Sequence, residues 1–433
     1  MPPSPTRSPD AEPAPEPSDT SVTPATDPPS EPAEQSASRP ASGRASGPHR
    51  WPMVWWQRLG AADREVLWLY LLTRIGVWTT AYCARWAFPS DARSHDAGPV
   101  LAPFQRWDWG FFLKVARDGY FPAEPAGEAG AGDNREAFFP GLPLLLRAVH
   151  SVVPSWGASG LLISFGAGAV AVVALARIAR THLSHADAGR RTALFLLLSP
   201  CAIFLAVGYS EALFLAFALP AWLAAQRNRW ALAAVLTALA TTVRITGLFL
   251  AAAIVVQFFL TARARASWRS LPWLALPVLP VALYTWYLHA RTGDWMAWQH
   301  AQERGWRRDF HTPWDAWAHT WQAAFTPAHS TTGYSLMFQA ELVAMVVGVL
   351  LLGLLVLRRH WAEATYVALN LWALGTSYWY MSIPRATLLW WPLWVALAAW
   401  SIRVPRFKTA YVCLVAPVTT IVALTFLTGR WAG

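Results

Sequence analysis

The chain has 433 residues, of which 55% are hydrophobic and 14% are charged, and its formal net charge is +10. A soluble domain carries about a quarter charged residues, so this composition excludes an ordinary soluble protein. Apolar runs of roughly 20 residues, such as 161–178, 336–357 and 411–427, predict transmembrane helices instead. Excess arginine is typical of cytoplasmic loops and lipid headgroups, and it does not indicate nucleic-acid binding.

The first 50 residues contain 13 of the 33 prolines, with Ser, Ala, Glu and Asp making up most of the remainder. Such a segment cannot bury enough apolar surface to offset its ordering entropy. We therefore predict a disordered cytoplasmic tail over residues 1–50 and a membrane domain over residues 51–433.

About eleven crossings are predicted after the tail, which gives an all-α polytopic membrane protein. Two long polar loops, 89–156 and 290–335, interrupt the series. The predicted crossings are 65–88, 157–179, 191–207, 211–226, 230–243, 247–260, 271–289, 336–357, 362–380, 387–402 and 409–427.

The distribution of basic residues predicts the orientation. The short basic connections belong in the cytoplasm by the positive-inside rule, which places both long loops outside. Segment 138–153 must then not cross, and Pro140, Pro143 and Arg147 interrupt it. We expect it to form a helix at the outer interface. The basic connections are 177–191, 227–229, 263–269, 358–359 and 403–408.

The first long loop contains a segment, residues 106–120, with an amphipathic pattern at helical spacing. Asp108 lies near its start, and Gly119 is a plausible stop. Taken alone, Asp108 is explained by an N-cap that satisfies free amides of this helix.

The predicted topology brings further polar residues to the same membrane edge as Asp108. Tyr209 and Glu211 form a turn between two crossings, Arg244 closes another turn, and Arg385 follows a proline in a third. Each alone is compatible with an ordinary polar turn. Together they suit the transfer of a sugar from a lipid-phosphate donor, because this reaction needs a carboxylate for the acceptor proton and cations for the phosphate.

The predicted site therefore has assigned roles. Asp108 is the general base, and Arg244 and Arg385, with Arg106 as a further candidate, hold the phosphate. Glu211 orients an arginine or a sugar hydroxyl, and Tyr209 belongs to the substrate-binding turn. No cofactor and no metal are predicted, because the histidines of the second loop are scattered along it.

Several short motifs occur in an order and spacing that resemble the PIG-V family, whose eukaryotic members add the second mannose of GPI anchors. They run from the first long loop to the turn before the tenth crossing. The motifs are Arg106-Trp107-Asp108, Gly119-Tyr120, Ala-Phe-Phe-Pro-Gly-Leu-Pro at 137–143, Ser199-Pro200, Tyr209-Ser210-Glu211, Arg244-Ile245-Thr246-Gly247 and Pro384-Arg385.

This resemblance implies a GT-C glycosyltransferase fold with outer juxtamembrane helices. It also implies a polyprenyl-phosphate-mannose donor, inversion at the anomeric carbon, and Asp108 as the catalytic acidic residue of the first loop. The family commonly has Trp-Asp-Ser and then a Trp-Tyr pair, whereas this chain has Trp109 after Asp108 and then Phe111-Phe112. We expect the indole of Trp109 to reshape the acceptor side.

High alanine and arginine content with little lysine suggests a bacterial, high-GC source. The expected location is then the plasma membrane, with the active site outside and an envelope lipid, glycan or protein as acceptor. A multi-pass transporter or lipid flippase is the alternative, and Arg74 inside the first crossing is the residue that favours it. A purely structural scaffold is the third reading, and the two long loops argue against it.

Overall fold

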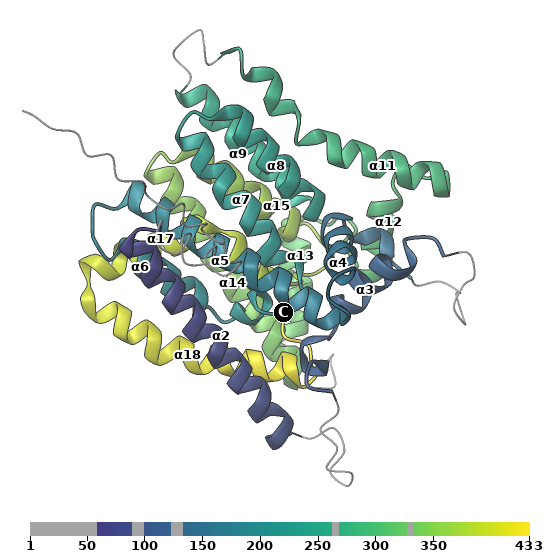
Figure 1. The fold of residues 1–433 in the computed structure, drawn as a ribbon, viewed down its shortest axis with the longest axis horizontal. Helices are drawn as coiled ribbons and strands as arrows, with labels where there is room; N and C mark the ends of the chain where they lie inside the picture. Colours follow the sequence, from purple (N-terminus) through teal and green to yellow (C-terminus); the bar gives the residue numbers. More distant parts are fainter. Residues whose placement is uncertain (1–58, 89–98, 123–132, 262–267, 327–331) are drawn as a thin grey trace, which may run out of the picture. The chain divides into compact units, whose positions relative to one another are not determined.

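The computed structural model describes residues 59–88, 99–122, 133–261, 268–326 and 332–433. The predicted tail, 1–50, lies outside these ranges. All regular structure within them is helical (Figure 1). The α-helices are α2 (Ala61–Ala87), α3 (Asp108–Asp118), α4 (Gly141–His150), α5 (Trp156–His182), α6 (Ala188–Leu197), α7 (Ser210–Gln226), α8 (Trp230–Val243), α9 (Thr246–Thr261), α11 (Val278–Thr292), α12 (Ala297–Trp306), α13 (Pro313–Phe325), α14 (Thr332–Leu357), α15 (Trp361–Gly375), α16 (Ile383–Ala386), α17 (Trp391–Arg403) and α18 (Pro405–Leu427).

Short 3-10 helices join several of these elements. They are η1 (Ala102–Phe104), η2 (Arg135–Ala137), η3 (Ala202–Leu205), η4 (Leu271–Ala275) and η5 (Thr387–Leu389).

Within the described ranges, four helical segments are long and apolar enough to cross a membrane: Trp156–His182, Leu271–Thr292, Gly333–Leu357 and Pro405–Leu427. Three shorter apolar helices, α7, α8 and α9, accompany them. The prediction of an all-α polytopic membrane protein is therefore confirmed. The number of eleven crossings stays a prediction, because short helices need help from bilayer thinning or packing to span.

Three predicted crossings are each divided into a 3-10 helix and an α-helix, and segment 271–289 divides into η4 and α11. Segment 191–207 divides into α6 and η3, and the break falls at Ser199-Pro200. Proline has no amide hydrogen and disfavours helical backbone in the residue before it, so the helix ends there. Segment 387–402 likewise divides into η5 and α17, with Trp390 between them.

The second long loop, predicted over 290–335, contains two helices, α12 and α13. The start of α13 has a clear sequence signal. Thr312 is its N-cap, and the Thr312 hydroxyl accepts a hydrogen bond from the amide of Asp315 at 3.3 Å. Pro313 occupies the first turn, where a missing amide hydrogen costs nothing.

The core is built around α7, which packs against α5 and α8, while α9 packs against α15. Large aromatic side chains fill it, including the fully buried Trp222, Tyr366 and Trp391. The short helices α3 and α4 pack on each other, and α12 contacts η2 beside them. Figure 1 shows α3, α4 and α12 together at one side of the helix bundle. This arrangement brings both long loops to the same region.

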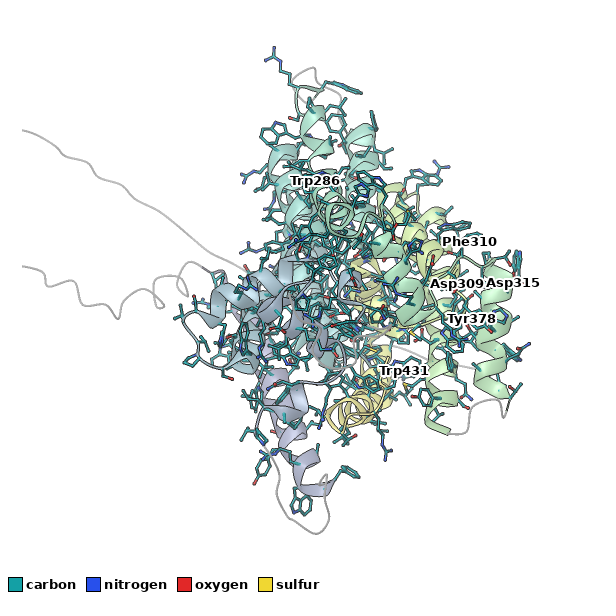
Figure 2. The ribbon with its side chains drawn as sticks, turned by 90° about the vertical axis from the view of Figure 1, so that its right-hand side faces the viewer. Trp286, Asp309, Phe310, Asp315, Tyr378 and Trp431 are labelled. Atoms are coloured by element: carbon teal, nitrogen blue, oxygen red, sulfur yellow. The ribbon has the colours of Figure 1, made fainter. Side chains whose placement is uncertain are left out.

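Two connecting segments from distant parts of the chain meet at that region. The amide of His311 donates to the carbonyl of Thr376 at 2.8 Å, and the amide of Tyr378 donates to the carbonyl of Arg307 at 3.2 Å. Figure 2 shows Asp309 and Phe310 near Tyr378. The connection between α12 and α13 is thereby attached to the connection between α15 and α16.

Candidate active site

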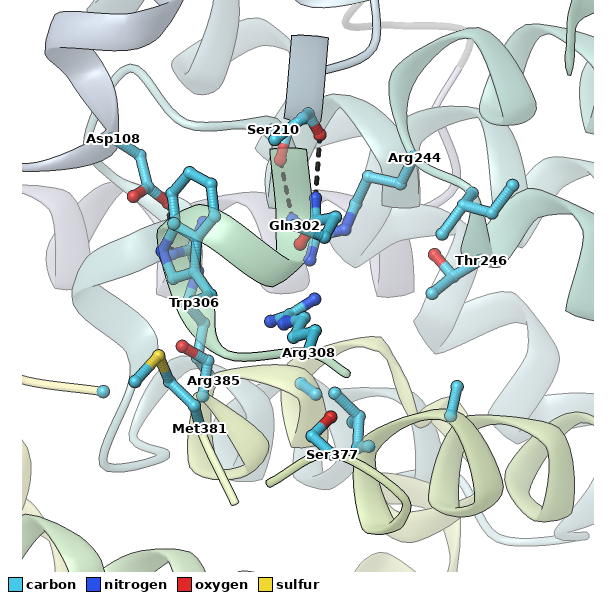
Figure 3. A pocket seen from close by; sticks show the side chains of 18 of the residues that line it. Asp108, Ser210, Arg244, Thr246, Gln302, Trp306, Arg308, Ser377, Met381 and Arg385 are labelled. Carbon is cyan, nitrogen blue, oxygen red and sulfur yellow. Dashed lines mark hydrogen bonds and ion pairs between the residues drawn. The ribbon is translucent and has the colours of Figure 1, made fainter. Parts of the chain in front are cut away.

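A cavity of about 870 Å³ lies where these connections converge. Its walls come from α3, the starts of α7 and α9, the α12–α13 connection and the α15–α16 connection. Figure 3 shows side chains of this lining from close by. The charged side chains that line it are Asp108, Arg244, Arg308 and Arg385.

Asp108 is the first residue of α3, and its carboxylate accepts a hydrogen bond from Nη1 of Arg385 at 2.6 Å. The N-cap of α3 is Trp107 rather than Asp108, so the N-cap explanation of Asp108 is wrong. Trp107, immediately before it, has a φ of 51°, and its indole nitrogen donates to the carbonyl of Arg430 at 3.2 Å. A left-handed backbone at a bulky residue costs energy and is common where a functional side chain must be aimed.

Tyr209 holds this turn in place. Its hydroxyl donates to the carbonyl of Arg106 at 2.7 Å and accepts from the amide of Asp108 at 3.1 Å. The whole Tyr209 side chain is buried. Tyr209 lies at the cavity, as the sequence predicted, and its clearest contact is with the backbone that carries Asp108.

Arg106, by contrast, does not join the site. Its side chain lies beside Gly429 and is absent from the cavity lining. Its Nε is buried and has no hydrogen-bond partner among the described residues. The predicted phosphate contact of Arg106 therefore has no geometric support.

Glu211 joins the two predicted arginines. Its Oε1 accepts from Nη1 of Arg244 at 2.8 Å and also from Nε of Arg385. The guanidinium of Arg385 also lies over the rings of Phe204 and Tyr209, at 4.9 and 4.8 Å from their centroids. Burial alone would lower the pKa of Arg385, but the carboxylates of Glu211 and Asp108 raise it above its ordinary value. Asp108, Glu211, Arg244 and Arg385 thus form one connected ionic network.

Glu341 supports this network and was missed by the sequence analysis. Its carboxylate accepts from the amides of Ser382 at 2.6 Å and Ile383 at 2.7 Å, just before Arg385. Ser382 has a φ of 67°, so the backbone enters α16 through a left-handed residue. A signal was present, because an acid inside an apolar run of about 20 residues is rare and marks function or a specific partner.

Arg308 lines the cavity and was also missed. It lies in the connection between α12 and α13, beside Arg304 and Arg307. The sequence alone does not show which of these three arginines faces the cavity. Only the folded arrangement turns Arg308 toward the cavity.

The indole of Trp109 is 3% exposed and is absent from the cavity lining. It packs between Gly160 and Gly208, where an added Cβ would lie 2.4 and 2.5 Å from the ring. Trp109 anchors α3 to α5 and to the start of α7, and its effect on the acceptor side stays a prediction.

One group of side chains in the described ranges could hold a metal ion, and it lies away from the cavity. His182, His360 and Glu363 have ligand atoms within 4.8 Å of one another. His182 ends α5, whereas Gly160 near the opposite end of that helix packs on Trp109. None of the three lines the cavity.

Fold and site define a class: a helical membrane protein in which carboxylates and arginines converge on one large cavity. Residues 83–265 match the family model described as Mannosyltransferase (PIG-V). The resemblance predicted from the motifs is confirmed, and this region of the chain is PIG-V-like. It includes Asp108, Tyr209, Glu211 and Arg244, whereas Arg308 and Arg385 lie beyond it.

Curated relatives agree with this match. The chain is 33% identical over 182 residues to a protein of Cricetulus griseus named GPI alpha-1,6-mannosyltransferase 2, which covers 40% of this chain and 34% of that protein. A protein of Mus musculus with the same name is 33% identical over 178 residues, which covers 39% of this chain and 34% of the relative. The chain thus spans about a third of the length of the curated relatives it matches. No solved structure matches the chain.

Proposed function

We propose that this protein is a membrane mannosyltransferase that moves a mannosyl residue from a polyprenyl-phosphate-mannose donor to an acceptor hydroxyl. The observation that carries the proposal is the pairing of Asp108 with Arg385 at the wall of one cavity, in a chain whose residues 83–265 are PIG-V-like. A base beside cations is what transfer from a lipid phosphate requires.

In the proposed reaction, one oxygen of Asp108 takes the proton of the acceptor hydroxyl. The acceptor oxygen attacks the anomeric carbon, and the bond from that carbon to the phosphate oxygen breaks with its electron pair going to the phosphate. The configuration inverts, because attack and departure occur on opposite faces of the sugar. Hydrogen bonding from Arg385 to Oδ2 leaves Oδ1 of Asp108 for the acceptor.

In this proposal Arg244 and Arg385 stabilise the leaving phosphate, and Glu211 holds both arginines in position. Glu211 is 0% exposed and binds both Arg244 and Arg385 through a single oxygen. Holding both guanidinium groups in fixed positions avoids the cost of reorganising them as negative charge develops. Their proposed role is electrostatic stabilisation of the departing polyprenyl phosphate.

The proposed setting is the bacterial plasma membrane, with the tail in the cytoplasm and the cavity open to the outer side. The positive-inside distribution of the basic connections supports this orientation. The proposed acceptor is an envelope lipid, glycan or protein. Aromatic side chains such as Phe249, Trp306 and Phe338 line the cavity and suit the prenyl chain.

The test uses purified protein in lipid vesicles with radiolabelled polyprenyl-phosphate-mannose and a crude envelope fraction as acceptor. The wild type should release polyprenyl phosphate only when acceptor is present, and Asp108→Asn should lose at least about a hundredfold in rate. Asp118→Asn changes an acid on the same helix whose side chain is 45% exposed, and it should retain activity. If Asp108→Asn is as active as the wild type, Asp108 is not the general base. Uptake of a solute into sealed vesicles without transfer of mannose would favour a transporter.

A further inference from the structure

The arginines that line the cavity are not all in ion pairs. Asp108 and Glu211 neutralise Arg385 and Arg244 through the connected network. Glu341 lies behind the wall, is 0% exposed, and gives both of its oxygens to backbone amides. One cation of the lining, Arg308, remains outside these pairs.

Arg308 extends into the space between Arg244 and Arg385, as Figure 3 shows. Within the described part of the chain, its guanidinium has no hydrogen bond and no ion pair. Burial, followed by the neighbouring charges of Arg244 and Arg385, lowers the pKa of Arg308 to about 10. The group is still charged at neutral pH, and it is only partly exposed. The carboxylates of Asp108 and Glu341 act on it through space but form no ion pair with it, so part of its charge is left without a direct partner. The site therefore favours the binding of an anion.

The backbone of this connection is built to keep Arg308 at the cavity. Gln299 donates to the carbonyl of Arg308 at 3.0 Å, and the carbonyl of Arg307 accepts from the amide of Tyr378. Arg307 has a φ of 49°, and its guanidinium lies over the rings of Tyr378 and Trp379 at 5.4 and 5.2 Å. The left-handed turn sends the two successive arginines to different places, Arg307 onto aromatic rings and Arg308 into the cavity.

We propose that Arg308 binds the phosphate of the donor, together with the ion-paired Arg244 and Arg385. This inference rests on the proposed function. Arginine suits the role because its planar guanidinium donates two hydrogen bonds to a phosphate and stays protonated.

The reaction adds a second demand on the same residue. When the anomeric bond breaks, its electron pair passes to the phosphate oxygen, so the diester becomes a monoester with more negative charge. Arg244 and Arg385 must weaken their hydrogen bonds to carboxylates before they can bind this added charge. Arg308 has no carboxylate hydrogen bond to weaken. Its contact with phosphate strengthens as the bond breaks, and such an interaction accelerates the chemical step.

A nucleotide diphosphate sugar is a poorer fit for this cavity. It carries at least two negative charges, and its phosphates commonly bring a divalent cation that requires oxygen ligands. Asp108 is the one carboxylate in the described lining, and Arg385 already binds it. The aromatic lining favours an apolar tail on the ligand.

The experiment compares Arg308→Gln and Arg308→Lys with Arg291→Gln, which removes an exposed arginine from the last turn of α11. Binding of polyprenyl phosphate and of uncharged polyprenol to purified protein is measured by quenching of tryptophan fluorescence, together with transfer rates. Arg308→Gln should weaken polyprenyl phosphate binding by about tenfold to a hundredfold and leave polyprenol binding unchanged. Arg308→Lys should recover part of the loss, and Arg291→Gln should match the wild type.

The outcomes separate the two proposals. If Arg308→Gln binds polyprenyl phosphate as tightly as the wild type while the wild type transfers mannose, the assignment of Arg308 is overturned and the function stands. If binding of polyprenyl phosphate depends on Arg308 but no mannose is transferred from any polyprenyl-phosphate donor, the lipid-phosphate site stands and the proposed function falls. Competition by a nucleotide diphosphate mannose, without competition by polyprenyl phosphate, would overturn the ligand class.

Discussion

At the scale of single residues, the site depends on one buried carboxylate that serves two arginines. Glu211 makes this possible because a single oxygen, Oε1, accepts from both Arg244 and Arg385. Asp108 then binds the far side of Arg385. The position of the proposed base and the positions of the proposed phosphate ligands are therefore coupled.

Replacing Glu211 with Gln should affect the whole network. The change leaves the buried Arg385 and the partly exposed Arg244 without their shared negative charge, and breaking a buried pair costs about 3–5 kcal/mol. We expect a lower melting temperature and a transfer rate reduced by about a hundredfold, because misplaced groups lose alignment. Thermal unfolding and initial rates measure both effects.

Glu65→Gln is the control for this change, because Glu65 is an exposed acid in the first turns of α2. It should leave both measurements unaltered. If Glu211→Gln keeps the wild-type melting temperature and transfer rate, the ionic network contributes to neither stability nor catalysis.

Arg74 gives a second prediction at this scale. It is 6% exposed, its three guanidinium nitrogens have no hydrogen-bond partner among the described residues, and it lies over the Tyr70 ring at 4.9 Å. A buried charge without a partner destabilises a fold, so Arg74→Met should match or exceed the wild-type melting temperature. Transfer activity should persist. A folded Arg74→Met protein without transfer activity would contradict this prediction and give Arg74 a role in the reaction.

Sequence patterns predicted much of this site. Asp108, Tyr209, Glu211, Arg244 and Arg385 lie at ends of predicted helices, and a topology that places those ends at one edge of the membrane also groups the residues. Arg308 and Glu341 were missed for different reasons. Arg308 depends on a left-handed turn at Arg307, which no local pattern encodes, whereas Glu341 stands in an apolar run and could have been noticed.

At the scale of elements, α3 carries Asp108, and its position depends on a fit between one indole and two glycines. Trp109 occupies the space that side chains at Gly160 and Gly208 would fill. The proposed base is next to this contact in sequence. A small shift of α3 would therefore move Asp108 relative to Arg385.

Gly208→Ala tests this dependence. The added Cβ would lie 2.5 Å from the Trp109 ring and 3.2 Å from the Cα of Gly160, so α3 must move. Overpacking of this kind costs about 1–3 kcal/mol, and we expect activity to fall by more than stability alone explains. Adding Trp109→Leu makes room and should restore part of the rate.

Gly166→Ala is the matched control on α5, since no atom lies within 4 Å of its added Cβ. It should behave as the wild type. If Gly208→Ala is fully active, then the position of α3 does not depend on this contact.

Helix ends were predicted well where the sequence contains a clear start or stop residue. α3 begins at Asp108 and ends before Gly119, whose φ of 77° suits glycine. Prediction failed where a proline divided an apolar run, at Ser199-Pro200, because apolar periodicity continues across such a break. It also failed for α12 and α13, because the polarity of this stretch led us to predict a loop. The N-cap at Thr312 would have indicated the start of α13.

At the scale of the whole molecule, composition was enough to predict a helical membrane protein. Orientation follows only from the distribution of basic residues, since lengths and apolar character do not distinguish the two sides. The proposed function needs the cavity to face outward. The orientation can be tested separately from the chemistry.

Cysteine labelling provides that test. In a background without Cys83, Cys201 and Cys413, Arg291→Cys should react with a membrane-impermeant maleimide in intact cells. Arg190→Cys, at a side chain that is 49% exposed in a predicted cytoplasmic connection, should react only after permeabilisation. The cysteine-free protein must first retain transfer activity. The reverse pattern of labelling would mean that the cavity faces the cytoplasm.

An experimental structure with a non-cleavable phosphonate analogue of polyprenyl-phosphate-mannose bound would test the proposed site most directly. We expect the phosphonate within hydrogen-bond distance of Arg308, the anomeric carbon between it and Asp108, and the prenyl chain along the aromatic wall. An analogue bound elsewhere on the helix bundle, with this cavity empty, would contradict the proposal.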